Sequence, residues 1–163
     1  HSIYIPAGGD IPDPVENDKF AHKLDFVTEL QDWFAKNRKK DDALVAVGDF
    51  NIAPLETDVW SHKQLLKVVS HTPIEVDHLN ELQSAFDWFD AVRAIIPPEE
   101  KVYTWWSYRA RDWEAADRGR RLDHIWVTQP LAANVKHAEV IKPARGWEPK
   151  PSDHCPVFVD LAF

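Results

Sequence analysis

The sequence predicts a mixed α/β fold in which helices cover the faces of a β-sheet. One segment repeats apolar residues at helical steps, a second opens with a helix-capping sequence, and six short apolar or aromatic runs are typical of strands. Their order, β-α-β-α followed by four strands, suits a mixed sheet with helices on its faces. A length of 163 residues with 44% hydrophobic side chains fits one globular domain.

The first part of the chain is expected to form two strands and one helix. Residues 2–5 are β-rich and predict a strand, and residues 18–38 predict a helix capped by Asp18. The buried stripe of this helix is expected to be Phe20, Leu24, Val27, Leu30 and Phe34. Residues 43–47 predict a strand buried on both faces that stops at Gly48, so that residues 49–54 form a connection.

The second part is expected to hold one helix and four strands. Thr72-Pro73-Ile74-Glu75 is a capping box with proline at the first helical position, which predicts a helix to about Phe86. Residues 87–96 are ambiguous between helix and strand. The remaining strands are expected at residues 102–108, 122–128, 135–141 and 155–161.

Composition excludes several classes of protein. No apolar run is long enough for a membrane span, and the single cysteine, Cys155, forms no internal disulfide, which fits a reducing compartment. The net charge of −8 argues against non-specific nucleic-acid binding. However, residues 101–124 carry six cationic and four acidic side chains, and local charge matters more than net charge for a cleft. Because methionine is absent and residue 1 is His, we expect a fragment or a processed piece.

Gly48-Asp49-Phe50-Asn51 is the first candidate for chemistry. Residues i and i+2 of extended backbone share a face, so Asp49 and Asn51 can point into one site. A carboxylate and an amide oxygen suit a hard cation such as Mg²⁺. An Asp/Asn turn, in which these side chains bond the local backbone, is the alternative interpretation.

Two further segments bring a histidine and two carboxylates. In Ser152-Asp153-His154, Asp153 could hold a metal while His154 moves a proton, provided that flanking prolines make the backbone irregular. Asp123 lies between apolar strand residues and needs a partner. We pair it with His154 rather than with adjacent His124, because consecutive strand residues diverge. A capping Asp beside a surface His is the alternative for residues 153–154.

The segment from Tyr103 to Arg121 combines aromatic and cationic residues. Trp105 and Trp106 precede Arg109 and Arg111, and Arg118-Gly119-Arg120-Arg121 closes the region. Aromatic platforms beside phosphate-binding cations are used by proteins that deform DNA, although core packing is the default explanation for aromatic clusters. The other histidines lack metal-ligand spacing, so no zinc site is expected.

In this order and spacing, the segments resemble the C-terminal portion of the exonuclease III family of apurinic/apyrimidinic endonucleases, within the endonuclease/exonuclease/phosphatase superfamily. The matching stretches are Tyr4-Ile5-Pro6, residues 48–54, residues 103–109, Arg121-Leu122-Asp123 and residues 152–157. The resemblance implies a four-layer fold, two packed β-sheets flanked by helices, of which this chain holds about one half to two-thirds. It implies that residues 1–163 are the C-terminal part of one catalytic domain.

The resemblance also implies a function in DNA repair: Mg²⁺-dependent (or Mn²⁺-dependent) hydrolysis of DNA phosphodiesters at abasic sites and 3′ ends. Tyr4 matches the family's active-site tyrosine, Asp49 the aspartate that activates water or protonates the leaving oxygen, and Asn51 the asparagine that orients it. Asp123 matches the acid that orients the histidine, and His154 that histidine.

Metal-associated and DNA-facing positions follow from the same resemblance. Asp153 matches a metal-associated aspartate, which gives Asp49, Asn51 and Asp153 as the expected metal ligands. The expected DNA-binding residues are Trp105, Arg109, Arg111 and Arg121. The family's metal-ligating glutamate and DNA-binding asparagine, which come from an N-terminal half, have no counterpart here.

The expected partners are double-stranded DNA with abasic sites or 3′ ends, and the N-terminal half of the same enzyme. An uncovered sheet would favour self-association, and the isolated chain is expected to bind Mg²⁺ weakly. We expect a cytoplasmic, nucleoid-associated protein of bacterial type. Two alternatives stay open, namely another phosphodiesterase or phosphatase of the superfamily, or a non-catalytic DNA-binding module.

Overall fold

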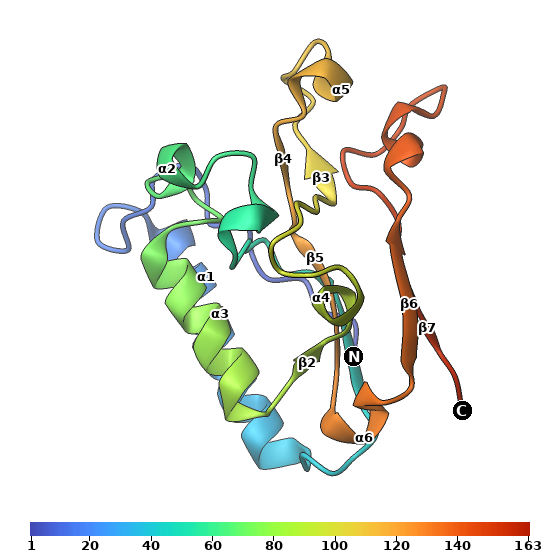
Figure 1. Ribbon diagram of the computed structural model, residues 1–163. Coiled ribbons are helices and arrows are strands. Elements are labelled where there is room, and N and C mark those ends of the chain that lie inside the picture. Colours follow the sequence, from blue (N-terminus) through green and yellow to red (C-terminus); the bar gives the residue numbers. More distant parts are fainter.

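A three-stranded antiparallel sheet forms the centre of the computed structural model, which describes residues 1–163. Strands β1 (Val45–Asp49), β5 (Asp123–Val127) and β2 (Phe89–Asp90) lie in the order β1-β5-β2. Helices α1 (Asp18–Asn37) and α3 (Pro73–Ala85) pack side by side on one face (Figure 1). The predicted mixed α/β class is confirmed.

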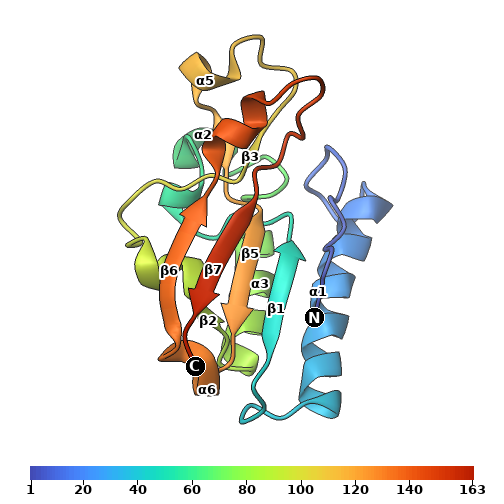
Figure 2. The same cartoon turned by 90° about the vertical axis from the view of Figure 1, so that its right-hand side faces the viewer.

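A second strand pair lies on the other face of this sheet. Strands β6 (Val135–Val140) and β7 (Val157–Leu161) are antiparallel and contact β5 (Figure 2). A ribbon of β3 (Trp105–Trp106) and β4 (Gly119–Arg120) extends beyond the end of β5 (Figure 1). The short helices are η1 (Glu56–Asp58), α2 (His62–Leu65), α4 (Ala91–Ile95), α5 (Trp113–Ala116), α6 (Gln129–Ala132) and η2 (Lys142–Gly146). No helix is long and apolar enough to cross a membrane.

Three layers are therefore visible: helices α1 and α3, the β1-β5-β2 sheet, and the β6-β7 pair (Figures 1 and 2). No helix lies over the outer face of β6 and β7 (Figure 2). The fold is thus consistent with part of the four-layer architecture, with its outermost layer on that side absent from this chain.

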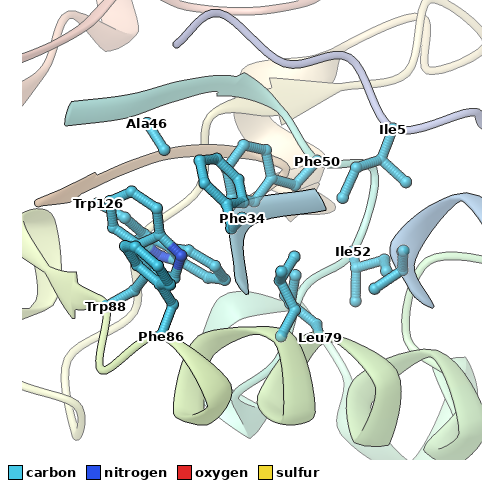
Figure 3. Close-up of a cluster of buried hydrophobic side chains, with 11 residues drawn as sticks. Ile5, Phe34, Ala46, Phe50, Ile52, Leu79, Phe86, Trp88 and Trp126 are labelled. Atoms are coloured by element: carbon cyan, nitrogen blue, oxygen red, sulfur yellow. The ribbon is translucent and has the colours of Figure 1, made fainter. Parts of the chain in front are cut away.

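The main core lies between the sheet and the two long helices (Figure 3). Ala46 and Trp126, which are paired across β1 and β5, face this core, and both are almost completely buried. The other members of the cluster are Ile5, Val27, Phe34, Phe50, Ile52, Leu79, Leu82, Phe86 and Trp88. The alternation puts residues 45, 47 and 49 on the opposite face of β1.

Both long helices begin with the predicted chemistry. The Asn17 side chain, rather than Asp18, caps α1 by accepting from the Lys19 backbone N–H. Glu75 accepts from the Thr72 backbone N–H and closes the capping box of α3, as predicted. These two ends anchor the helices beside the end of β1 that carries the site.

Several strand boundaries differ from the predictions. Residues 2–5 pair parallel with β1 but form only one isolated bridge, at Ser2. The second strand spans Val45–Asp49 rather than residues 43–47, because Gly48 keeps pairing with His124 instead of ending it. Residues 102–108 contain only the two-residue β3, and residues 87–96 divide into β2 and α4.

Gly48 is required by the close approach of the first residues of the chain. Its φ is 139°, and a Cβ atom at this position would overlap the carbonyl oxygen of Ile3. The Ile3 N–H donates to the Val47 carbonyl at 2.8 Å. Only glycine adopts this backbone conformation without strain. Gly48 therefore lets Ile3 and Ile5 lie directly against β1.

Replacing Gly48 by alanine is expected to lower the free energy of unfolding by about 3 kcal/mol, because strain and overlap add. Urea unfolding measures this change. Gly146→Ala is the control, since a Cβ there meets only Trp113, at 3.8 Å. Equal stability of the two variants would contradict the role given to Gly48.

Candidate active site

The register of β1 and β5 places two carboxylates opposite each other. Asp49, the last residue of β1, pairs with Asp123, the first residue of β5. Partners directly opposite in an antiparallel pair have their side chains on the same face. The next residue continues the contact, since the Phe50 N–H donates to the Leu122 carbonyl at 2.8 Å. Two aspartates 74 positions apart therefore share one end of the sheet.

Asn51 holds the Asp49 carboxylate from both sides. Its backbone N–H donates to Oδ1 of Asp49 at 2.9 Å, and its side-chain Nδ2 donates to Oδ2 at 3.0 Å. The same Nδ2 donates to the Ile5 carbonyl at 2.8 Å. Asn51 has a φ of 51°, a left-handed conformation that asparagine tolerates. The local turn and the shared site, which were alternative interpretations, are both present.

A buried lysine fixes the backbone of this turn. Nζ of Lys23, on α1, donates to the Asn51 carbonyl at 2.8 Å and forms an ion pair with Glu75 at 2.5 Å. Both side chains are fully buried. Burial lowers the pKa of Lys23, although the adjacent Glu75 opposes this shift. Helices α1 and α3 are thus connected directly to the Asp49–Asn51 turn.

His154 completes the group. Its Nδ1 lies 2.8 Å from Oδ2 of Asp123, and its Nε2 lies 3.8 Å from Oδ2 of Asp49. The predicted hydrogen bond between Asp123 and His154 is therefore present. One ligand atom from each of Asp49, Asp123 and His154 lies within 4.8 Å of the others, so these three side chains could hold a metal ion.

Burial and charge shift the proton affinities in this group. Burial by itself lowers the pKa of His154, but the hydrogen bond to Asp123 and the charges of Asp123 and Asp49 outweigh it and raise the pKa. Burial raises the pKa of Asp49, against the opposing effect of the Asn51 N–H. A carboxyl group that holds its proton more tightly and an imidazole that does the same are suited to proton transfer.

The backbone around His154 is irregular, as predicted. Residues 153–155 lie outside β7 and run against β3, where His154 forms an isolated bridge with Trp105. The Trp106 N–H donates to the Asp153 carbonyl at 2.9 Å, and the Cys155 N–H donates to the Thr104 carbonyl at 2.7 Å. These two hydrogen bonds flank His154 and fix its position.

Two predicted site residues, Asp153 and Tyr4, are not among these three clustered side chains. The Asp153 carboxylate accepts a hydrogen bond from Nε1 of Trp105 at 2.9 Å. The group of three clustered side chains contains Asp123 but not Asp153. Of the expected ligands Asp49, Asn51 and Asp153, only Asp49 belongs to this group, and the metal-binding roles of Asn51 and Asp153 stay predictions. Tyr4 is 63% exposed, and its hydroxyl forms no hydrogen bond within the chain.

A pocket of about 680 Å³ opens beside His154 and Asn51. Seven of its eighteen lining residues are aromatic or cationic: Trp60, Trp105, Trp106, Trp113, Arg109, Arg118 and Arg120. The guanidinium of Arg118 lies 4.8 Å from the Trp60 ring centre, and that of Arg120 lies 5.3 Å from the Trp105 ring centre. Rings and cations of this kind suit a nucleotide with its phosphates.

The four predicted DNA-binding residues have different positions. Trp105 and Arg109 line the pocket, and Arg111 is exposed but does not line it. The prediction for Arg121 is wrong, because this residue is buried and its guanidinium contacts Asp58 and Asp90, each at 2.7 Å. Arg120 faces the pocket instead, since neighbouring residues in extended backbone point to opposite sides.

Sequence reasoning missed Trp60 and Arg120 as individual pocket residues. The alternation of Arg120 and Arg121 could have identified Arg120. Trp60 gave no signal, because it follows a long connection and reaches the pocket only by pairing with β4, where its N–H donates to Gly119 at 3.1 Å.

The fold and the site define an α/β protein with two carboxylates and an imidazole beside a cationic, aromatic pocket. The Endonuclease/Exonuclease/phosphatase family matches residues 2–154, and the chain belongs to this family. It is similar to exodeoxyribonuclease III of Haemophilus influenzae, with 30% identity over 149 residues, 88% of this chain and 55% of that protein.

Solved structures give the same result. An AP endonuclease from Archaeoglobus fulgidus has a TM-score of 0.91 and 27% identity, over 99% of this chain and 60% of that one. A 3′ phosphatase from Neisseria, bound to a product DNA hairpin, has a TM-score of 0.86 and 27% identity over the same shares. The chain thus spans little more than half the length of these relatives.

His124 belongs to the core rather than to the site. It is fully buried, stacks on Phe50 with ring centres 5.0 Å apart, and its Nε2 lies 2.8 Å from the Ile52 carbonyl. Burial, together with the positive charge of Arg121, lowers the pKa of His124 to about 4.

Stability is expected to fall as the pH drops from about 6.5 toward 4. His124 is neutral in the folded chain throughout this window, whereas the unfolded chain, with a pKa near 6.5, binds the proton. Each pH unit below 6.5 therefore costs up to about 1.4 kcal/mol. Urea unfolding between pH 7 and pH 5 measures the slope, which His124→Gln is expected to reduce.

The exposed His137 provides the matched control, so His137→Gln is expected to keep the wild-type slope. An unchanged slope in His124→Gln would show that His124 is not buried and neutral.

Proposed function

We propose that this chain is the catalytic part of a DNA repair nuclease, which hydrolyses phosphodiester bonds at abasic sites and at 3′ ends. The observation that carries the proposal is the group formed by Asp49, Asp123 and His154 at the edge of a pocket with four tryptophans and three arginines. The similar proteins, an exodeoxyribonuclease and an AP endonuclease, support the same substrate class.

We further propose Mg²⁺ as the cofactor, with Mn²⁺ as a substitute. The donor set fits a hard cation, because Asp49 and Asp123 offer carboxylates close together. The Asn51 amide nitrogen is already bonded to Asp49 and Ile5, so its oxygen is the atom left for a ligand. When bound, the ion would supply Lewis acidity and neutralise charge on the phosphate.

The residues of this chain divide the proton chemistry. In hydrolysis, a water oxygen forms a bond to phosphorus, the bond from phosphorus to the 3′ oxygen breaks, and that oxygen takes a proton. Asp123 accepts from Nδ1 of His154 and so directs Nε2 of the imidazole toward Asp49 and the phosphate. Asp49 and the Asp123–His154 pair then serve as acid and base, and Asn51 keeps the Asp49 carboxylate in place.

The pocket favours DNA over the other substrates of the superfamily. A lone phosphate needs no flat surface, whereas Trp60 and Trp105 present rings near the site, and Arg109 and Arg118 add positive charge. Stacking surfaces combined with phosphate-binding cations are typical of nucleic-acid sites. A phosphatase acting on a small phosphomonoester would leave this surface unused.

Cleavage of a duplex containing one abasic site tests the proposal, using the intact gene product that contains this chain. Cleavage is expected in Mg²⁺ and not in EDTA. Asp49→Asn and His154→Gln are each expected to lower kcat by about 100-fold or more, because each removes an acid–base group. His137→Gln, an exposed histidine, is the control and is expected to keep full activity.

A phosphoinositide is the competing substrate in the same assay. Faster turnover of this lipid than of abasic DNA would favour the phosphatase alternative. Mg²⁺-independent duplex binding with no turnover would favour a non-catalytic module. Either result would contradict the proposal.

The face of the sheet opposite the helices is only partly covered by β6 and β7. We also propose that a further part of the same enzyme covers the rest of this face, and that the isolated chain self-associates through it. Val47 of β1, which faces away from the helices, and Val157 and Leu161 of β7 are only partly buried. Apolar sheet faces of this kind favour association.

Sedimentation velocity of the isolated 163-residue chain tests this expectation. A sedimentation coefficient that rises with concentration is expected, and Val47→Thr is expected to reduce the rise. Val15→Thr is the control, because Val15 is 90% exposed in a loop away from this face. A monomer at every concentration would contradict self-association.

A further inference from the structure

Thr104 lies where three segments of the chain meet, and it is completely buried. Its backbone N–H donates to the Arg120 carbonyl at 2.9 Å, which connects it to β4. Its carbonyl accepts from the Cys155 N–H at 2.7 Å, which connects it to the segment that carries His154. One residue therefore joins β4 to residues 153–155 through its backbone alone.

The Thr104 side chain makes the third connection. Its hydroxyl oxygen accepts from two consecutive backbone N–H groups, those of Leu122 at 2.9 Å and of Asp123 at 3.0 Å. These two residues lie where β4 has ended and β5 begins. The hydroxyl oxygen thus satisfies two buried donors at the start of the strand that carries Asp123.

We propose that Thr104 is a positioning residue for the Asp123–His154 pair. Its hydroxyl fixes the backbone of Asp123, its carbonyl fixes the backbone next to His154, and the two side chains meet at 2.8 Å. The Thr104 side chain bonds only to backbone groups, so it acts through these two residues rather than on the substrate. The consequence for catalysis rests on the nuclease function proposed above.

Thr104→Val isolates the role of the hydroxyl group. Valine keeps the shape of threonine but cannot accept a hydrogen bond, so two buried N–H groups lose their partner. The start of β5 must then move to find another acceptor, and the carboxylate of Asp123 moves with it. Misplacement of a catalytic group by about 1 Å costs up to about 100-fold in rate.

Thr128 offers a matched control at the opposite end of β5. It is also completely buried, and its hydroxyl accepts from the Leu44 N–H at 2.9 Å and donates to the Asp42 carbonyl at 2.6 Å. Thr128→Val therefore removes a comparable buried hydroxyl directly after β5, at the end of this strand far from Asp123. Both valine variants are expected to lose stability in urea.

The kinetic test compares three variants of the intact gene product on abasic duplex. Thr104→Val is expected to lower kcat by about tenfold or more with little change in KM, because positioning acts on the reacting groups. Thr128→Val is expected to keep kcat within about twofold, and Thr104→Ser, which retains the hydroxyl, is expected to restore most of the rate. Equal losses of kcat in the two valine variants would overturn the proposal.

NMR gives a readout that does not depend on turnover. The low-field proton of the His154 imidazole, bonded to Asp123, is expected to weaken or move upfield in Thr104→Val and to stay in place in Thr128→Val. An unshifted signal in Thr104→Val would overturn the proposal even if the rate fell. If the wild-type enzyme cuts no DNA while the signal responds as expected, the nuclease function fails and the positioning of His154 by Thr104 stands.

Discussion

The antiparallel pairing of β1 with β5 is the constraint on which the site depends. It sets Asp49 opposite Asp123, and so brings together carboxylates that lie far apart in the sequence. A shift of one residue in this register would turn one of the two to the helix-covered face. The core opposes such a shift, because Ala46 and Trp126 fill the space against α1 and α3 only in the observed register.

Charged residues are divided between structure and surface in a way that net charge does not reveal. Arg121 and Arg93 are buried around Asp58; burial would raise the pKa of that carboxyl, but the two guanidinium groups outweigh it and lower the pKa. This ion cluster lies directly before the strand that carries Asp123. The cations near the pocket, Arg109 and Arg118, remain exposed and available to a phosphate backbone.

The sequence predicted the site better than it predicted the strand boundaries. Asp49, Asn51, Asp123 and His154 could be predicted because each belongs to a short recognisable motif, and the structure brings them together. The sequence did not indicate that Trp60 lines the pocket, because its place there depends on a backbone hydrogen bond to β4. The DNA-binding prediction for Arg121 was wrong because the sequence does not distinguish neighbouring arginines. In the structure Arg121 contacts the buried Asp58, whereas Arg120 lines the pocket. The observed strand boundaries differ from the predicted ones at residues such as Gly48. Glycine normally ends a strand, but Gly48 continues the pairing of β1 with β5.

A double-mutant cycle between Asp123 and His154 tests the central claim, that these two side chains act as one unit. Asp123→Asn, His154→Gln and the double variant are compared with the wild-type enzyme by kcat on abasic duplex. Residues that act as a unit are strongly non-additive, so Asp123→Asn is expected to cost about 100-fold or more with His154 present and little once His154 is replaced. Equal costs of Asp123→Asn in both backgrounds would contradict the account.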